Sequence, residues 1–171
     1  LVELVDRCAR SMNKHFKNNF EILIIDDGST DETQLVLSRL VKKYSFLNGI
    51  ILRTNFGKSI ALMSGFSRAK GKFIVTLDAD LQDCPEEIPM LISKLKKGYD
   101  LVNGWRFKRK DGWFRKLGSR FFNFVVRRYT GLSLRDENCG FKAYRRQVVE
   151  NLFVYGQFHR LIPLQIYLRG F

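Results

Sequence analysis

The stretch Phe73-Ile74-Val75-Thr76-Leu77-Asp78-Ala79-Asp80-Leu81-Gln82 joins an apolar run to a set of oxygen-bearing side chains. The run 73–77 predicts a buried strand. Beyond it, Asp78, Asp80 and Gln82 occupy every second position, and in extended backbone this spacing places all three side chains on one face. Carboxylate and amide oxygens suit Mg²⁺ or Mn²⁺, with phosphate oxygens completing the coordination shell. The stretch therefore predicts a metal site at the end of a buried strand.

A structural role also fits this stretch. Asp83 lies near the N-cap position of the next predicted helix and Pro85 lies in its first turn, so the polar residues could simply form a capping loop. The position of the stretch favours a ligand site, because α/β proteins bind ligands at the carboxyl ends of parallel strands. The residues of this stretch alone fit both a metal site and a capping loop.

Strands and helices alternate on both sides of the stretch. The residues Ser29-Thr30-Asp31-Glu32 fit a capping box that opens a helix ending near Lys43. The apolar spacing predicts further helices over 1–17, 57–69 and 85–97, and strands over 21–25, 49–53, 72–77 and 99–103. The residues expected to face inward are Ile60, Met63 and Phe66 in one helix, and Ile88, Leu91, Ile92 and Leu95 in the next. This order predicts a single α/β domain over 1–171 with a doubly wound, mostly parallel sheet and flanking helices.

Charge is unevenly distributed along the chain. Residues 1–105 carry 15 Lys and Arg against 13 Asp and Glu, a balance of +2, whereas residues 106–171 carry 15 against 4, a balance of +11. A one-sided excess of this size indicates an anionic partner, such as a phosphorylated ligand, nucleic acid or an anionic membrane surface. A basic face that is merely solvated is the alternative.

Residues 112–130 predict an amphipathic helix in the basic half. Bulky apolar residues share one stripe and arginines fall mostly outside it, a pattern typical of a helix at a membrane interface and equally of a helix that faces a protein core. No stretch reaches the roughly 18 apolar residues of a membrane span. Cys8, Cys84 and Cys139 are widely spaced, so we expect reduced thiols in a cytosolic setting.

Four further motifs carry polar groups. Asp26-Asp27-Gly28-Ser29 follows a predicted strand, where a carboxylate could bind a nucleotide base or ribose or could cap a helix. Asn55-Phe56-Gly57-Lys58-Ser59 places a glycine and a lysine at a helix start, where phosphate can bind. Gly104-Trp105-Arg106, with Arg120 further on, offers arginines that could grip phosphate, and the stretch 136–146 gathers polar groups around Gly140.

Taken in order, these five motifs resemble the family 2 glycosyltransferases, and more narrowly the polyprenyl-phosphate glycosyltransferases. The resemblance covers nearly the whole chain. It implies a GT-A fold, a UDP- or GDP-sugar donor with UDP favoured, and a polyprenyl phosphate acceptor at the cytoplasmic face of a membrane. It also implies inversion at the anomeric carbon, an anionic membrane surface and a homo-oligomer as partners, and no nucleic acid.

The resemblance assigns roles residue by residue. It places Asp26 or Asp27 at the nucleoside, together with Gly28, Ser29 and Lys58 in the donor pocket, and it makes Asp78, Asp80 and Gln82 the Mg²⁺ or Mn²⁺ shell. Arg106 and Arg120 match arginines that hold the acceptor phosphate, and residues 112–130 match the juxtamembrane helix that presents the lipid. With Asp78 and Asp80, the two arginines form the expected catalytic set.

The sequence also departs from the family pattern. The family's first strand and carboxy-terminal membrane helices have no counterpart in residues 1–171, so we expect a truncated GT-A catalytic domain, and an inactive fragment is one interpretation. Gln157 stands where relatives often carry Glu, and His159 suits packing as well as catalysis. Two alternatives remain: a family 2 enzyme with a sugar or polysaccharide acceptor, which needs a carboxylate base, and a nucleic-acid binder, which leaves the Asp78–Gln82 pattern unexplained.

Overall fold

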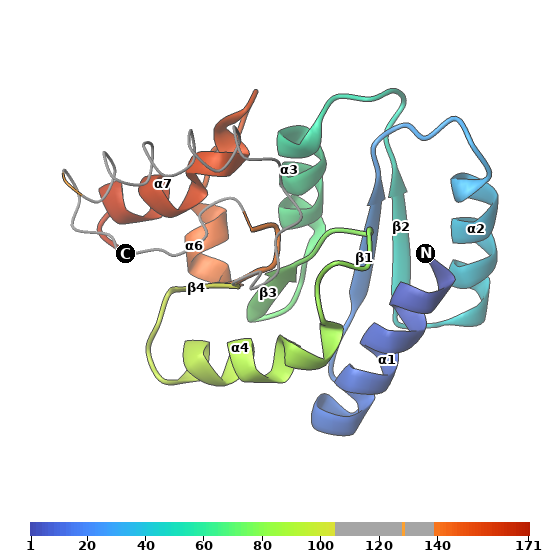
Figure 1. The fold of residues 1–171 in the computed structure, drawn as a ribbon, viewed down its shortest axis with the longest axis horizontal. Coiled ribbons are helices and arrows are strands. Elements are labelled where there is room, and N and C mark those ends of the chain that lie inside the picture. The colour runs from blue at the N-terminus through green and yellow to red at the C-terminus, as the bar shows by residue number, and fades with distance from the viewer. Residues whose placement is uncertain (105–127, 129–138) are drawn as a thin grey trace.

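A computed structural model of the chain describes residues 1–104, 128 and 139–171. Figure 1 shows a sheet region with helices packed around it. The strands are β1 (Ile22–Asp26), β2 (Leu47–Ile51), β3 (Phe73–Thr76), β4 (Leu101–Asn103) and β5 (Lys142–Arg145). The helices are α1 (Val2–Phe16), α2 (Thr33–Lys43), α3 (Lys58–Arg68), α4 (Ile88–Lys96), α6 (Arg146–Glu150) and α7 (Ile162–Leu168), with 3₁₀ turns η1 (Pro85–Glu87) and η2 (Phe158–Leu161).

The strands of the described residues form two hydrogen-bonded groups. β1 and β2 pair in parallel, with Ile22 opposite Leu47 and Asp26 opposite Ile51. The other group has the order β3-β5-β4, and β5 runs antiparallel to both of its neighbours. The prediction of a mostly parallel sheet is therefore corrected, because residues 142–145, which the sequence placed in a polar site segment, form the central antiparallel strand of this group.

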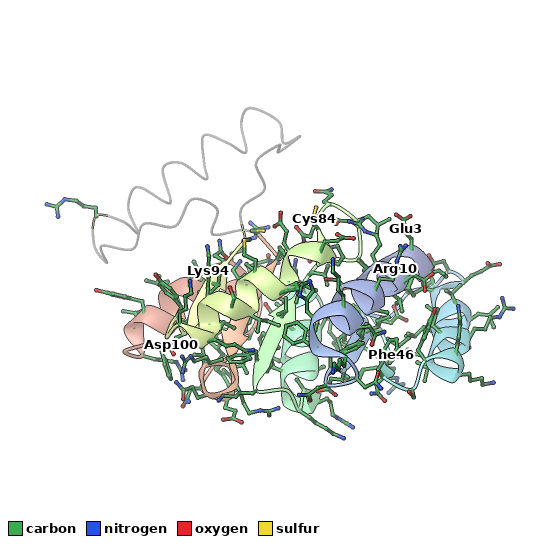
Figure 2. All side chains as sticks on the ribbon, turned by 90° about the horizontal axis from the view of Figure 1, so that it is seen from below. Glu3, Arg10, Phe46, Cys84, Lys94 and Asp100 are labelled. Carbon is green, nitrogen blue, oxygen red and sulfur yellow. The ribbon has the colours of Figure 1, made fainter. Side chains whose placement is uncertain are left out.

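Helices α1 and α4 lie side by side against one face of the sheet (Figure 2). Their apolar residues meet β4 and β5 in one core cluster, which contains Leu4, Cys8, Ile88, Leu91, Ile92, Leu95, Val102, Cys139, Phe141 and Ala143. The four residues predicted to face inward from α4 all belong to this cluster, since their i, i+3, i+4, i+7 spacing forms a single stripe. Burial raises the pKa of the Cys8 thiol to about 11, so this cysteine is a packing residue.

Helices α3, α6 and α7 cover the opposite face. Their core cluster contains Phe66, Ile74, Tyr144, Val148, Val149, Leu152, Val154, Ile162 and Ile166. Ala143 and Tyr144 are neighbours on β5 that belong to different clusters, because successive strand residues point to opposite faces. The two clusters thus make a three-layer α/β arrangement.

Two local predictions are corrected. The capping box does not form: α2 begins at Thr33, and Ser29 donates its hydroxyl to Asp26 instead of capping that helix. Ile60 was expected to face inward from α3 but is 41% exposed, while Met63 and Phe66 contact the core as predicted. Ile60 lies in the first turn of α3, beyond the edge of the core that Phe66 reaches.

Two arginines of the predicted polar stretch 136–146 stabilise the fold. Arg145 donates to the carbonyl oxygens of Leu95 and Tyr99 at 2.9 and 3.1 Å, at the end of α4. Arg146 donates to those of Ala69 and Gly71 at 2.7 and 3.1 Å, just beyond α3. Each guanidinium thus ties β5 and the start of α6 to main-chain carbonyls at or just beyond the end of a helix.

Apart from residue 128, the predicted helix at 112–130 lies outside the described residues, and so do Arg106 and Arg120. Within the part of the chain that the structure describes, no helix is both long enough and apolar enough to cross a membrane.

Candidate functional site

Asp27 joins the loop after β1 to the loop after β2. Its Oδ1 accepts a hydrogen bond from the backbone N–H of Phe56 at 2.8 Å, and its Oδ2 accepts one from Gly57 at 2.9 Å. Both carboxylate oxygens are thus engaged by main-chain donors just before α3. Asp27 fixes the position at which α3 begins, and with it the side chain of Lys58.

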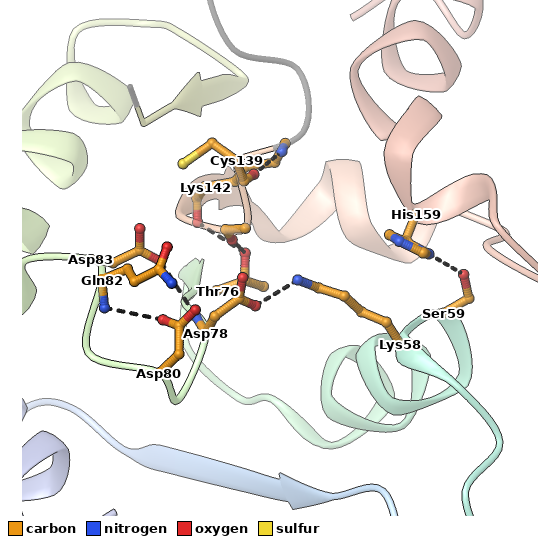
Figure 3. Close-up of polar contacts among 11 residues, drawn as sticks. Lys58, Ser59, Thr76, Asp78, Asp80, Gln82, Asp83, Cys139, Lys142 and His159 are labelled. Atoms are coloured by element: carbon orange, nitrogen blue, oxygen red, sulfur yellow. Dashed lines mark hydrogen bonds and ion pairs between the residues drawn. The ribbon is translucent and has the colours of Figure 1, made fainter. Parts of the chain in front are cut away.

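Lys58 is the first residue of α3 and bridges to the end of β3. Its Nζ lies 2.5 Å from Oδ1 of Asp78, the first acidic residue after that strand (Figure 3). Together, the Asp27 and Lys58 contacts connect the segments that follow β1, β2 and β3. These two contacts bring together three of the five predicted motifs, and Gly140 of a fourth lies against Asp78.

Residues 78–82 form a turn rather than the extended backbone that the sequence predicted. Ala79 and Asp80 are turn residues, and Leu81 has a positive φ of 62°. The Asp80 carboxylate accepts the N–H of Gln82 at 3.0 Å, the local bond by which aspartates favour turns. The predicted extended arrangement of these side chains on one face is therefore wrong, although the turn still gathers Asp78, Asp80 and Gln82 at the end of β3 (Figure 3).

The chemistry of this group fits a hard divalent cation. Two carboxylates and an amide oxygen are the donor types that Mg²⁺ and Mn²⁺ prefer, and the ammonium of Lys58 already pairs with one of them. Among residues 1–104, 128 and 139–171, no three His, Cys, Asp or Glu side chains gather into a group that could hold a metal ion. A cation at Asp78 and Asp80 therefore depends on the Gln82 amide and on ligands from outside the protein, such as phosphate oxygens.

Gly140 closes the other side of Asp78. A Cβ added at Gly140 would lie 2.5 Å from Oδ2 of Asp78, so only glycine lets the β5 side of the site approach that carboxylate. The hydroxyl of Thr76, at the end of β3, donates to the Gly140 carbonyl at 2.8 Å and holds this approach in place. The glycine at position 140 thus allows the predicted polar segment to pack directly against Asp78.

Asp26 ends β1 and is only 4% exposed. Its Oδ1 accepts the backbone N–H of Ser29 at 3.0 Å and also the Ser29 hydroxyl. Over the described part of the chain, Oδ2 of Asp26 is buried and has no hydrogen-bond partner. Because an unpaired buried carboxylate oxygen is costly, this atom is a candidate acceptor for a ligand N–H or O–H.

Gly28 brings the loop after β1 against the segment after β2. It has a φ of +72°, and an added Cβ would lie 2.4 Å from the carbonyl carbon of Thr54. Both features exclude a side chain at this position. Gly28 therefore allows the close approach that places Asp26 and Asp27 beside the start of α3.

Ser59 and His159 form a contact that no local sequence pattern predicts. Ser59 is 1% exposed and its hydroxyl donates to the carbonyl of Gly156 at 2.7 Å. Nδ1 of His159 lies 3.1 Å from the same Oγ, so we assign the proton of that contact to the imidazole. Burial, followed by the charges of Lys58 and Arg160, lowers the pKa of His159.

This contact fixes η2 against the start of α3, next to Lys58 (Figure 3). His159 therefore makes a packing and hydrogen-bonding contact, one of the two roles that its sequence position left open. The only advance signal for Ser59 was its position beside Lys58 at a helix start. Its partner is 100 residues away in the chain, which local patterns do not reveal.

The chain matches the family model "Glycosyl transferase family 2" over residues 2–153. It is 41% identical over 147 residues to an undecaprenyl-phosphate 4-deoxy-4-formamido-L-arabinose transferase of Aeromonas hydrophila, covering 85% of this chain and 45% of that protein. The enzyme of the same name from Proteus mirabilis is 36% identical over 165 residues, covering 96% of this chain and 50% of that protein. The chain thus spans about half the length of these curated relatives.

The fold resembles that of glucosyl-3-phosphoglycerate synthase from Mycobacterium tuberculosis. The crystal structure of that enzyme with Mn²⁺, UDP-glucose and phosphoglyceric acid matches with a TM-score of 0.67 and 23% identity, over 86% of this chain and 54% of that one. At this identity the likeness concerns the fold alone. The α/β architecture of the described residues is accordingly of the GT-A type.

Proposed function

Because the chain belongs to glycosyl transferase family 2, we propose that the protein transfers a sugar from a nucleotide-sugar to a polyprenyl phosphate at the cytoplasmic face of a membrane. Two relatives that share 41% and 36% identity with this chain are named for transfer to undecaprenyl phosphate. The observation that carries the proposal is the placement of Lys58 against Asp78 at the end of β3, with the loop after β1 tied to the same helix start.

The nucleotide-sugar donor is assigned to the acidic residues that follow β3. Asp78, Asp80 and Gln82 would hold Mg²⁺ or Mn²⁺. When bound, such a cation supplies charge neutralisation for the nucleoside diphosphate leaving group. Oδ2 of Asp26 is the assigned acceptor for a donor N–H of the base or a ribose hydroxyl, because it is buried and both oxygens of Asp27 are already engaged. Gly28 and Ser29 hold Asp26 in place, and a UDP-sugar is the favoured donor.

The acceptor is assigned to the basic half of the chain. Arg106 and Arg120 would bind its phosphate, and residues 112–130 would lie along the membrane surface and present the lipid. Apart from residue 128, these lie outside the described residues, so this assignment rests on the family resemblance and on the +11 balance of residues 106–171.

The protein's own contribution is positioning and charge screening. The acceptor phosphate is already ionised at neutral pH, so attack on the anomeric carbon needs no strong general base. The donor diphosphate and the acceptor phosphate must instead be held close together, and cationic side chains reduce the repulsion between these two anions. Direct attack by the phosphate oxygen would invert the anomeric configuration. A sugar acceptor would require a carboxylate base, and this chain has Gln157 where relatives often carry Glu.

The experiment is a transfer assay on the full-length protein with radiolabelled UDP- and GDP-sugars and Mn²⁺. A short polyprenyl phosphate and a soluble sugar are offered as competing acceptors in the same reaction. The proposal predicts labelled polyprenyl-phosphate sugar, lost when EDTA is added. Label that enters only the soluble sugar would support the alternative family 2 activity and refute the lipid acceptor.

A further inference from the structure

Asp78 is held between a cation and a glycine. Its Oδ1 lies 2.5 Å from Nζ of Lys58, and its Oδ2 faces Gly140, where an added Cβ would lie 2.5 Å away (Figure 3). The carboxylate assigned to the metal is therefore already neutralised by a side chain of the protein. A divalent cation that binds Oδ1 must first displace the ammonium group, because the two cannot share this short contact.

We propose that Lys58 is the counter-ion of Asp78 while the donor is absent, and that it gives up this position when a divalent cation arrives with the donor diphosphate. The proposal rests on the proposed function, since it takes Asp78 as a metal ligand. It adds an exchange of cations at one carboxylate and a new position for Lys58, beside the incoming diphosphate.

The backbone around Lys58 is anchored, whereas its side chain has room to move. Asp27 binds the N–H of Gly57, and Ser59 is bonded to Gly156, so the residues on both sides of Lys58 are fixed. The side chains of Lys58 and Asp78 are 40% and 30% exposed, so solvent screens their ion pair and separating them costs little. The flexible stem of the lysine then lets the ammonium leave Asp78 without moving α3.

This exchange couples metal binding to nucleotide binding. Without nucleotide, the metal must compete with the ammonium of Lys58 for the Asp78 carboxylate, and this competition weakens metal binding. With nucleotide, the displaced ammonium gains the diphosphate as a new partner, so the same displacement no longer costs an ion pair. Because such coupling is reciprocal, the metal should strengthen nucleotide binding by the same factor that nucleotide strengthens metal binding.

The test measures Mn²⁺ binding to the full-length protein by the electron paramagnetic resonance signal of free Mn²⁺, with and without UDP. In the wild type, UDP should tighten Mn²⁺ binding. In Lys58→Met, Mn²⁺ alone should bind about twofold to fivefold more tightly, as expected for removal of a partly exposed ion pair, and the strengthening by UDP should shrink. Lys58→Arg, which keeps the charge, should behave like the wild type in the absence of UDP.

Lys72→Met is the matched control, because it removes the same charge at the opposite end of β3. Lys72 precedes the four-residue strand β3 and Asp78 follows it, so the two lie roughly 15 Å or more apart along the strand, beyond the screening length of about 8 Å in physiological salt. An unchanged or weaker Mn²⁺ affinity in Lys58→Met would overturn the exchange. An equal gain of Mn²⁺ affinity in Lys72→Met would also overturn it. So would an Asp78→Asn variant that binds Mn²⁺ as tightly as the wild type. If the Mn²⁺ results hold but no sugar reaches polyprenyl phosphate, the acceptor assignment fails and the exchange stands.

Discussion

The carboxylate of Asp27 accepts the backbone N–H of Gly57 at 2.9 Å and so ties the loop after β1 to the start of α3. Its other oxygen binds the N–H of Phe56. Asp27→Ala removes the acceptor of both N–H groups. Because Phe56 is exposed, water can replace the acceptor of its N–H, so we expect the free energy of unfolding to fall by only about 1–2 kcal/mol. Urea denaturation measures the change. The control is Asp31→Ala, which removes an exposed acceptor of the Thr33 N–H. An equal loss of unfolding free energy in both variants would contradict the role of Asp27 in tying the two loops together.

Gly140→Ala tests the close packing around Asp78. The added Cβ would push against the end of a flexible carboxylate, so Asp78 should turn away while the fold survives. We expect Mn²⁺ affinity to fall about tenfold, as for the loss of one charged ligand contact, with little change in unfolding free energy. Gly65→Ala is the control, because its Cβ would meet Ile25 at an ordinary 3.4 Å. Unchanged Mn²⁺ affinity in Gly140→Ala would remove Asp78 from the metal site.

His159 should make stability depend on pH. Its pKa is lowered in the folded chain by burial and by neighbouring cations, whereas an unfolded histidine titrates near its ordinary value of about 6.5. Between these values the unfolded state binds more protons, so the free energy of unfolding should rise with pH through that window and fall on acidification below about 6.5. His159→Gln should lose this part of the slope in urea titrations from pH 5 to 8.

The exposed His15, near the end of α1, supplies the control for removing a histidine as such. The assignment of a neutral imidazole bonded to Ser59 fails if wild type and His159→Gln show the same slope. Ser59→Ala should also destabilise the chain, because it removes the buried hydroxyl that bonds to both the Gly156 carbonyl and the His159 ring.

Arg120→Ala tests the acceptor side of the proposal. If this guanidinium binds the lipid phosphate, its loss should raise the apparent KM for polyprenyl phosphate about tenfold, the effect of one charge-assisted hydrogen bond. The apparent KM for the nucleotide-sugar should change much less. Arg10→Ala, on the outer surface of α1, is the control (Figure 2). Equal changes for both substrates would count against the assignment.

The sequence predicted the elements whose patterns are local. The stripe of Ile88, Leu91, Ile92 and Leu95 located α4 and its buried face, and the apolar run at 73–77 located β3, because both follow from backbone periodicity. The resemblance in five motifs also predicted glycosyl transferase family 2, and the match to that family over residues 2–153 confirms it.

What the sequence missed depends on distant partners. β5 (Lys142–Arg145) has charged ends and no apolar alternation, and it is a strand because β3 and β4 supply hydrogen-bonding partners on both sides. The turn at 78–82 depends on a positive φ at Leu81, a conformation that no pattern indicates for leucine. The contact between Ser59 and His159 likewise exists only once η2 packs on α3.

The central claim is that the acidic end of β3 supports sugar transfer to a lipid phosphate. The most direct measurement compares wild type and Asp80→Ala in the full-length protein, following labelled polyprenyl-phosphate sugar as Mn²⁺ is titrated. Asp80 is exposed, so the variant should fold as the wild type does, and circular dichroism checks this. We predict Mn²⁺-dependent lipid product in the wild type and its loss in Asp80→Ala. Equal product from both proteins at every Mn²⁺ concentration would contradict the account.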